Sequence, residues 1–474
     1  MPARESLAGN KISGSDAPAR GLRTTSDDEG KLIEWIESTL DGKVERCERQ
    51  KRWRPAWFVN VRRDGQAIPL YVRGWRNEAF PPWPLEYEAG VLTRLAAGGI
   101  PVPKIYGMTK EPYAIVMDRA RGRHNLETAT DEAERISVLV HLAEIMAAMH
   151  QLPIDPFVEM GMYCPEPGSD TALNVYRYCE AGYLKAKQRP DPRMEFVRKW
   201  IRLNTPTKTT SPRLLHADSG QFMFENGRIT AMLDFEFAVL GDPIHDLAAL
   251  RSRAIGQPMG DLRPLFDRYR ELTGTKISRE LLGFYSVSWR IVTALNTANS
   301  LVTPQNRSDH YLEYICRYIS SLLNTLRDIA EIENISFEEP AAISDSPSRW
   351  ALSFSLYEDR LDELGKSAPA QEEKYQLFRT KAFVTFTSRL NQHGHFIEAE
   401  YMSSVNQLAN GAAKTWEEAD ALLETFLETA SPEQDRRVLQ IIYTWIRRQA
   451  SLLEGLVRYH QLTVPYQPLS ELCD

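Results

Sequence analysis

The sequence of 474 residues has few cysteines and no long apolar stretch. Its cysteines are odd in number, widely spaced and free of any Cys-x-x-Cys pair: Cys47, Cys164, Cys179, Cys316 and Cys473. This pattern argues against a disulfide framework and against a zinc site. No apolar run approaches the roughly 18 residues of a membrane span, and the N-terminus lacks the apolar core of a signal peptide. We therefore expect reduced thiols, no membrane partner and a cytoplasmic protein.

The chain also lacks an excess of positive charge: it has 57 Lys and Arg residues against 64 Asp and Glu residues, which gives a formal net charge of −7. A chain with this balance is not expected to attract nucleic acid through its overall field. We therefore expect no nucleic-acid partner. Hydrophobic residues make up 43% of the chain and charged residues 26%, as in ordinary soluble globular proteins. The chain is long enough for two or three domains with real cores.

Composition divides the chain at two places. Residues 1–28 are rich in Gly, Ser, Ala and Arg without periodicity, which predicts a disordered tail. A stretch at 333–349 is rich in Glu, Pro, Ala, Ser and Asp and reads as a linker. Beyond it only helices are expected, and the clearest begins at Ser431, where Pro and then Gln follow in the pattern of a capping box.

Between these two breaks, strands and helices alternate. Strand-like runs at Trp57–Val61 and Ile68–Val72 flank Asp64-Gly65, which is typical of a hairpin. A helix is expected over Leu85–Ala97, ended by Gly98-Gly99. The segment after residue 119 is mostly helical but contains a second hairpin. The order indicates an α+β protein with a helical C-terminal part.

The most informative stretch lies between Leu215 and Glu236. It contains a loop, a strand, a tight turn at Asn226-Gly227 and a second strand that ends in an acid. A hairpin brings its two ends together, so Asp218 and Asp234 should lie near each other. Two carboxylates with an amide can hold a divalent cation through oxygen ligands, and one carboxylate can accept the proton of an attacking hydroxyl. The pattern indicates phosphoryl transfer.

This stretch resembles the catalytic and metal loops of the aminoglycoside phosphotransferase family, relatives of the protein kinases. The matching segments are His216-Ala217-Asp218, Leu233-Asp234-Phe235-Glu236 and Gly241-Asp242-Pro243-Ile244-His245-Asp246-Leu247-Ala248. The resemblance implies that Asp218 is the catalytic base, that His216 belongs to the catalytic loop and orients it, and that Asp234 is the main metal ligand. Asp246 would brace the catalytic loop.

The resemblance also implies a two-lobed protein-kinase-like α+β fold with an additional C-terminal helical domain. The lobes would comprise residues 29–118, which bind the nucleotide, and residues 119–335, which are catalytic; residues 350–474 would form the C-terminal domain. Upstream segments resemble the parts that hold ATP. Arg73 would pair with the phosphates and Glu88 with Arg73, while the hinge around Met117 and Arg119 would bind adenine. The expected cofactors are ATP, with GTP as the other option, and Mg²⁺.

Three departures from the family pattern bear on these expectations. The catalytic loop is short and lacks the family's Asn, so Gln221 becomes the candidate second metal ligand; simple loop packing is its alternative role. The Gly-rich turn of the first hairpin is replaced by Arg49-Gln50-Lys51-Arg52-Trp53-Arg54-Pro55, whose cations either substitute for backbone amides at the phosphates or form a solvated turn. Arg73 stands where the family has Lys.

The sequence thus predicts an ATP-dependent phosphotransferase that acts on a hydroxyl of a small molecule, with a hydroxylated metabolite or a hydroxyacyl-CoA among the options. One alternative is a catalytically impaired, pseudokinase-like binding or regulatory protein. Another is a kinase acting on protein, which the short interval between Asp234 and Gly241 disfavours because it leaves no room for an activation-loop insertion. The C-terminal domain could cap the acceptor site, form a homodimer or bind a partner.

Overall fold

The computed structural model describes residues 26–50, 54–75, 83–302, 311–343, 348–369, 371–456 and 467–474. The chain divides into two compact units, Met1–Asn174 with Lys208–Ile277, and Val175–Thr207 with Ser278–Asp474. This division groups residues 278–335 with the C-terminal helices. The domain ranges expected from the sequence stay a prediction.

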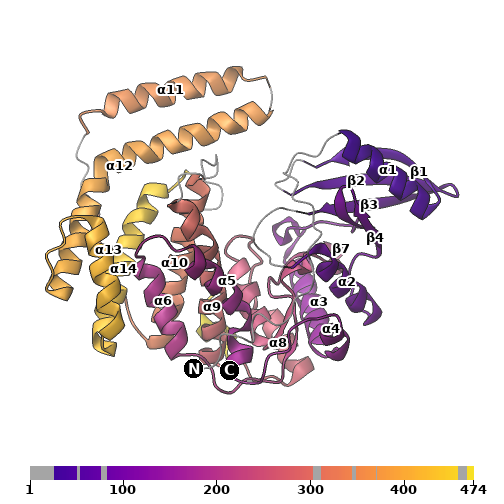
Figure 1. Ribbon diagram of the computed structural model, residues 1–474, viewed down its shortest axis with the longest axis horizontal. Helices are drawn as coiled ribbons and strands as arrows, with labels where there is room; N and C mark the ends of the chain where they lie inside the picture. The colour runs from indigo at the N-terminus through magenta and orange to yellow at the C-terminus, as the bar shows by residue number, and fades with distance from the viewer. Residues whose placement is uncertain are drawn as a thin grey trace. The chain divides into compact units, whose positions relative to one another are not determined.

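A five-stranded antiparallel sheet opens the first unit, in the order β1-β2-β3-β5-β4 (Figure 1). Its strands are β1 (Lys43–Arg49), β2 (Ala56–Arg63), β3 (Gln66–Gly74), β4 (Ile105–Lys110) and β5 (Tyr113–Asp118). The predicted hairpin is confirmed as β2 and β3, and the turn residues Asp64 and Gly65 have φ of 49° and 75°. Both values suit the type I′ turn that Asp-Gly favours.

The sequence pattern did not predict strand β1. Its residues, KVERCER, are mostly charged and half or fully exposed, so they give no alternating apolar signal. The strand forms through its pairing with β2, which is a tertiary effect.

One face of the sheet packs on helix α1 (Ser26–Leu40). Leu32, Ile36 and Leu40 recur at helical spacing and are buried against strand residues that include Trp57 and Val72. The residues Ser26-Asp27-Asp28-Glu29 have the Ser and Glu spacing of a capping box, but the Ser26 side chain lies outside the described residues. Burying one of the apolar side chains of α1, such as Leu32, contributes about 1.5–3 kcal/mol to the stability of the fold. Helix α2 (Leu85–Ala97) has the predicted bounds and ends at Gly98 and Gly99.

The rest of the first unit contains the loop and the hairpin that carry His216, Asp218 and Asp234. Its helices and strands are α3 (Glu132–His150), α4 (Asp155–Glu159), β6 (Arg213–Leu215), β7 (Phe222–Glu225), β8 (Arg228–Met232), β9 (Val239–Gly241), α7 (Ile244–Arg253) and α8 (Arg263–Thr273). Strands β6 and β9 pair with each other, as do β7 and β8. Short 3₁₀ turns lie at Leu126–Thr128 and Phe235–Phe237.

The second unit is helical throughout the part that the structure describes. Helix α5 (Ser169–Ala186) begins in the first unit and continues in the second. The others are α6 (Pro192–Leu203), α9 (Arg279–Ala298), α10 (Tyr311–Glu333), α11 (Ala351–Ser367), α12 (Gln371–Ala409), α13 (Trp416–Thr429), α14 (Pro432–Leu453) and α15 (Leu469–Leu472). The capping box predicted at Ser431 is confirmed: its hydroxyl accepts from the Gln434 amide, and the Gln434 side chain accepts from the Ser431 amide.

Helices α11 and α12 lie side by side within this unit (Figure 1). Leu361 is the one residue of α11 that is buried, whereas Leu352, Leu356 and Tyr357 are each more than half exposed. Helix α11 is therefore held mainly by its contact with α12.

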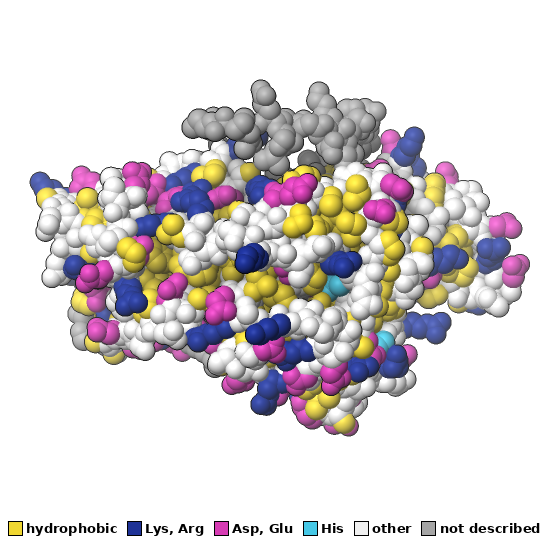
Figure 2. Space-filling view, turned by 90° about the horizontal axis from the view of Figure 1, so that it is seen from below, with side chains coloured by type: hydrophobic (Ala, Val, Ile, Leu, Met, Phe, Trp, Pro, Cys, Tyr) yellow, Lys and Arg dark blue, Asp and Glu magenta, His cyan; other side chains and the backbone are white. Residues whose placement is uncertain are grey.

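The described helices include none that is both long enough and apolar enough to cross a membrane. On the face shown in Figure 2, acidic and basic side chains are interspersed rather than gathered by sign.

Candidate functional site

The β7–β8 hairpin sets the distance between the two candidate acids. Its turn residues Asn226 and Gly227 have φ of 51° and 73°, as a two-residue turn requires. The hairpin is prolonged beyond its strands because the Leu233 amide donates to the Gln221 carbonyl at 2.9 Å. The two ends therefore meet, as predicted from the Asn-Gly turn. Asp234 follows directly in a left-handed conformation, with φ 67° and ψ 56°.

Asp246, on the first turn of α7, holds the loop that precedes the hairpin. Its fully buried carboxylate accepts from the backbone amides of His216 and Ala217, each at 2.8 Å, and from His150 Nε2 at 3.1 Å. Burial alone would raise the pKa of Asp246, but hydrogen bonding from His150 and nearby positive charge outweigh it and hold the pKa well below the usual range. The carboxylate stays ionised and anchors the loop.

The His216 side chain is fully buried, and both of its ring nitrogens contact backbone groups. Its Nε2 lies 2.8 Å from the Leu233 carbonyl oxygen, which can only accept, so Nε2 carries the proton. Nδ1 is then the acceptor for the Asp218 amide at 3.3 Å. His216 thus links the loop before the hairpin to the strand after it. It does not line the cavity described below.

Asp218 is held by two side chains at once. Its Oδ1 forms an ion pair with Arg253 Nη2, and its Oδ2 accepts from Gln221 Nε2 at 2.8 Å. Burial raises the pKa of Asp218, the positive charge of Arg253 acts against this, and the charge of Asp234 adds to the rise. A raised pKa moves a carboxylate toward the range in which it can accept a proton from a hydroxyl.

Arg73, on β3, connects the sheet to Asp234. Its Nε donates to Glu88 Oε2 on α2 at 2.7 Å, and its Nη2 pairs with Asp234 Oδ1 and with Glu236 Oε2, the latter at 3.0 Å. Burial acts to raise the pKa of Asp234, but the charges of Arg73 and Arg54 prevail and hold it well below its usual value. The predicted Arg73–Glu88 pair is present, and the same guanidinium also reaches the candidate metal ligand.

Arg54 takes part in this network rather than in a solvated turn. It is buried, and its Nη2 pairs with Glu236 Oε2. Arg49 is likewise engaged, since its Nη1 donates to the carbonyls of Gln50 and Ala56 at 2.8 and 3.2 Å. Lys51, Arg52 and Trp53 lie outside the described residues. The two described arginines of this run serve the protein's own framework, so neither is available to replace a Gly-rich phosphate loop.

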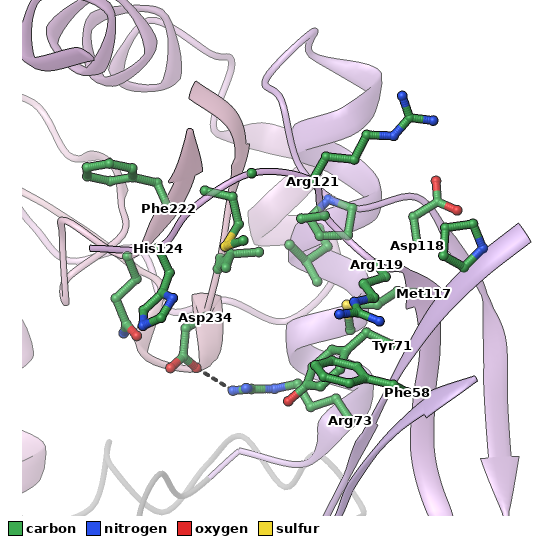
Figure 3. A pocket seen from close by; sticks show the side chains of 18 of the residues that line it. Phe58, Tyr71, Arg73, Met117, Asp118, Arg119, Arg121, His124, Phe222 and Asp234 are labelled. Atoms are coloured by element: carbon green, nitrogen blue, oxygen red, sulfur yellow. Dashed lines mark hydrogen bonds and ion pairs between the residues drawn. The ribbon is translucent and has the colours of Figure 1, made fainter. Parts of the chain in front are cut away.

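Arg73 and Asp234 line a cavity of about 950 Å³ in the first unit, whereas Asp218 and Arg54 are not among its lining residues. Figure 3 shows Arg73 pointing toward Asp234, with the rings of Phe58 and Tyr71 beside it and Phe222 farther along the wall. Gln221, Met117 and Arg119 also line the cavity, together with Glu88. Aromatic faces next to a cation and a carboxylate are what a nucleobase and a phosphate chain need.

The hinge segment differs in detail from the expectation. The amides of Asp118 and Arg119 already donate to the carbonyls of Lys104 and Pro69, both at 2.9 Å. These two amides are therefore occupied, and a base edge would meet neighbouring backbone groups such as those of Ala120, which also lines the cavity. The Arg119 guanidinium lies 3.8 Å from the centroid of the Phe58 ring, a cation–π distance.

Arg253 and Gln257 were not expected from the sequence. Arg253 Nη1 donates to Gln257 Oε1 at 3.3 Å, and Gln257 lines the cavity. A signal existed: Arg253 lies seven residues after Asp246 on the same helix, and residues two turns apart share a face. Because Asp246 was expected to face the catalytic loop, Arg253 had to face it as well.

No group of three or more His, Cys, Asp or Glu side chains is placed to hold a metal ion, as far as the described residues extend. The expected ligands Asp234 and Gln221 both line the cavity, but Gln221 directs its amide nitrogen to Asp218.

Comparison with known proteins shows what the segment around this site is similar to. Residues 55–279 match the model of the phosphotransferase enzyme family. A crystal structure from Ralstonia eutropha JMP134, of a protein assigned to the aminoglycoside phosphotransferases, is 18% identical with a TM-score of 0.50; the match covers 63% of this chain and 97% of that one. Identity at this level supports the fold alone, which is that of the kinase-like phosphotransferases.

The curated relatives are longer proteins. Acyl-CoA dehydrogenase family member 11 of Rattus norvegicus is 25% identical over an alignment of 264 residues, which covers 48% of this chain and 32% of the relative. Acyl-CoA dehydrogenase family member 10 of Mus musculus is 24% identical over an alignment of 181 residues, which covers 35% of this chain and 16% of that protein. The chain therefore spans about a third or less of these relatives. Residues 55–279, which match the phosphotransferase enzyme family, contain every residue that lines the cavity.

Proposed function

We propose that this protein transfers the γ-phosphoryl group of ATP to a hydroxyl of a small molecule. The observation that supports this best is that Asp234 and the Arg73–Glu88 pair line one cavity, while Asp218 is hydrogen-bonded to Gln221, which lines it as well. The acceptor oxygen would bond to the γ-phosphorus, the bond to the β–γ bridging oxygen would break, and the hydroxyl proton would pass to Asp218. ADP and a phosphate monoester are then the products.

The lining of the cavity supports nucleotide binding. The faces of Tyr71 and Phe58 lie on the sheet side and Phe222 on the hairpin side, so a base can stack among them. Arg73 would take the phosphates, since guanidinium groups bind phosphate oxygens bidentately. Because Asp234 and Glu236 pair with Arg73, phosphate binding would exchange one set of anionic partners for another. ATP and GTP both satisfy this chemistry.

The donor set fits a magnesium ion that arrives with the nucleotide. Mg²⁺ is commonly held by one or two carboxylates together with phosphate oxygens and water, and it does not need an all-protein cage. Asp234 supplies a carboxylate that stays ionised, and Gln221 keeps an amide oxygen after donating to Asp218. Bound there, Mg²⁺ would neutralise charge on the phosphates.

The acceptor is best sought among hydroxylated metabolites. Polycationic aminoglycosides need acids in the acceptor site. Of the four acids that line the cavity, Glu88 and Asp234 are paired with Arg73, Asp118 accepts from the Tyr106 hydroxyl at 2.8 Å, and Glu225 is the fourth. The curated relatives are named as acyl-CoA dehydrogenase family members, so hydroxyacyl-CoA thioesters belong in the first panel of compounds.

One observation favours a second function, that of a nucleotide-binding protein without turnover. Both Asp218 and Asp234 are engaged by arginines, and Gln221 faces Asp218 instead of a metal position. If phosphates cannot displace these partners, the site binds nucleotide without positioning it for transfer.

The deciding experiment measures MgATP consumption against aminoglycosides, sugars, choline-like alcohols and hydroxyacyl-CoAs. It compares the wild type with Asp218→Asn and with the matched surface variant Asp267→Asn, whose carboxylate pairs with Arg270. Turnover that depends on one compound class, survives Asp267→Asn and is lost in Asp218→Asn supports the kinase. ATP binding by calorimetry without turnover on any compound supports the second function, and absence of both refutes the proposal.

A further inference from the structure

We propose that Arg253 is the positioning residue of the base Asp218, and that it replaces the support which a longer catalytic loop would give. The inference rests on the proposed function, because it assigns Arg253 a part in that reaction.

The contacts of Arg253 all converge on the catalytic loop. Besides the ion pair of Nη2 with Asp218 Oδ1, Nε donates to the Ser219 carbonyl at 2.9 Å. The remaining Nη1 donates to Gln257 at 3.3 Å. One guanidinium thus fastens the side chain of the base, the backbone next to it and a residue that lines the cavity.

The loop needs such a fastening because it is short and bent. Ala217 and Gly220 both have positive φ, 62° and 96°, and they flank Asp218 and Ser219. A left-handed non-glycine residue costs of order 1–3 kcal/mol and persists only where its surroundings hold it. Asp246 holds the loop on the side of Ala217. Arg253 holds it on the side of Gly220, where an added Cβ would lie 2.8 Å from Arg253 Cδ.

Both oxygens of the base are fixed in this way. Oδ1 is bound to Arg253 and Oδ2 to Gln221, so the plane of the carboxylate is determined before any substrate arrives. The side chains of Asp218 and Arg253 are 22% and 17% exposed, so their attraction is less screened than that of a surface pair. Each carboxylate oxygen has a further lone pair for the acceptor hydroxyl.

A purely structural role is the competing explanation. Arg253 is the last residue of α7, and basic side chains often end helices for local reasons. In that case its loss would disturb the fold without acting through Asp218. The two roles differ in whether the effects of changing Arg253 and Asp218 are independent.

The test is a double-mutant cycle with Arg253→Met, Asp218→Asn and their combination, with Arg253→Lys as the conservative variant. Arg263→Met is the matched control, since Arg263 is 60% exposed and pairs with Asp261. Turnover is measured as MgATP consumption, with the acceptor from the panel or with water. Each variant is also unfolded with urea, which gives a cycle that does not depend on activity.

We expect Arg253→Met to lower kcat on the order of 100-fold with a nearly unchanged KM for ATP, because a misplaced base affects the chemical step alone. Arg253→Lys should recover part of this loss, since it keeps the charge but not the planar fork. The double variant should be no slower than Asp218→Asn, and its shift in urea midpoint should be smaller than the sum of the single shifts.

Additive effects in both cycles, or a fall in kcat that the control shares, would overturn the role of Arg253. Absence of MgATP binding and turnover in the wild type would instead refute the proposed function. The urea cycle would then decide by itself whether Arg253 holds Asp218.

Discussion

Asp246→Asn tests how strongly Asp246 anchors the loop at residues 216–218. The substitution keeps the size of a fully buried side chain that accepts from two backbone amides and from His150. An amide has one acceptor oxygen, so its NH₂ group must face a donor. One buried N–H then loses its partner, at a cost of about 1–3 kcal/mol, and the remaining bonds lose their charge assistance. We expect the free energy of unfolding to fall by about 3–5 kcal/mol, as when a buried ion pair is broken.

The pH dependence of this loss has a definite sign. The pKa of Asp246 is held far below its unfolded value, so its contribution is complete above a pH of about 5 and is lost as the pH falls toward the folded pKa. The wild type and Asp246→Asn should therefore converge in stability as the pH is lowered from 7 to 3. Urea unfolding followed by circular dichroism at each pH measures this difference.

Asp242→Asn, four residues earlier, is the matched control with the opposite sign. Burial raises the pKa of Asp242, although hydrogen bonds from the Ile244 and Thr210 amides oppose the rise. The wild type therefore gains stability relative to Asp242→Asn as the pH falls. If Asp246→Asn unfolds at the wild-type urea concentration at pH 7, or if its deficit does not depend on pH, the anchoring argument is refuted.

Three further predictions concern a tightly packed glycine, a buried ion pair and a helix cap. Gly122→Ala should lower the free energy of unfolding by about 1–3 kcal/mol, because Gly122 has φ of 96° and an added Cβ would lie 2.2 Å from the Phe224 carbonyl oxygen; an unchanged urea midpoint would contradict this. Arg193→Met should cost about 3–5 kcal/mol, because the buried Asp420 loses its positive partner and two bonds at 3.0 and 2.7 Å while it keeps the bond from the Tyr401 hydroxyl; rescue in the double variant with Asp420→Leu, read as a recovered melting temperature, checks it. Ser431→Ala should cost about 1 kcal/mol by removing one half of the capping box of α14, and Ser431→Asp should restore it in the same urea measurement.

Local signals sufficed for the parts of the fold that have local causes. The turns at Asp64-Gly65 and Asn226-Gly227, the bounds of α2 and the capping box at Ser431 each depend on a few neighbouring residues, and each appears where it was predicted. Strand β1 could not be found in this way, because its charged residues become a strand only through pairing with β2.

The site followed the same rule. The convergence of the hairpin ends was predictable from one turn, whereas the partners of the charged groups were not. Arg54 pairs with Glu236 across 182 residues of sequence, and no spacing rule reaches that far. The pairing of Arg73 with Asp234 depends likewise on how the sheet meets the hairpin. The roles of the individual site residues stay predictions until the variants are measured.

The first unit is assembled from two stretches of chain, with Val175–Thr207 belonging to the second unit between them. During synthesis this unit cannot be completed until Ile277 has left the ribosome, although most of its residues precede Asn174. Helix α6 completes its packing still later, because it contacts α9 and α13, which are synthesised after Ile277. No single cut separates the two units, so a protein truncated after Ile277 would retain α6 without those partners. Such a truncated protein would be a poor substitute for the whole chain, which every assay described above should therefore use.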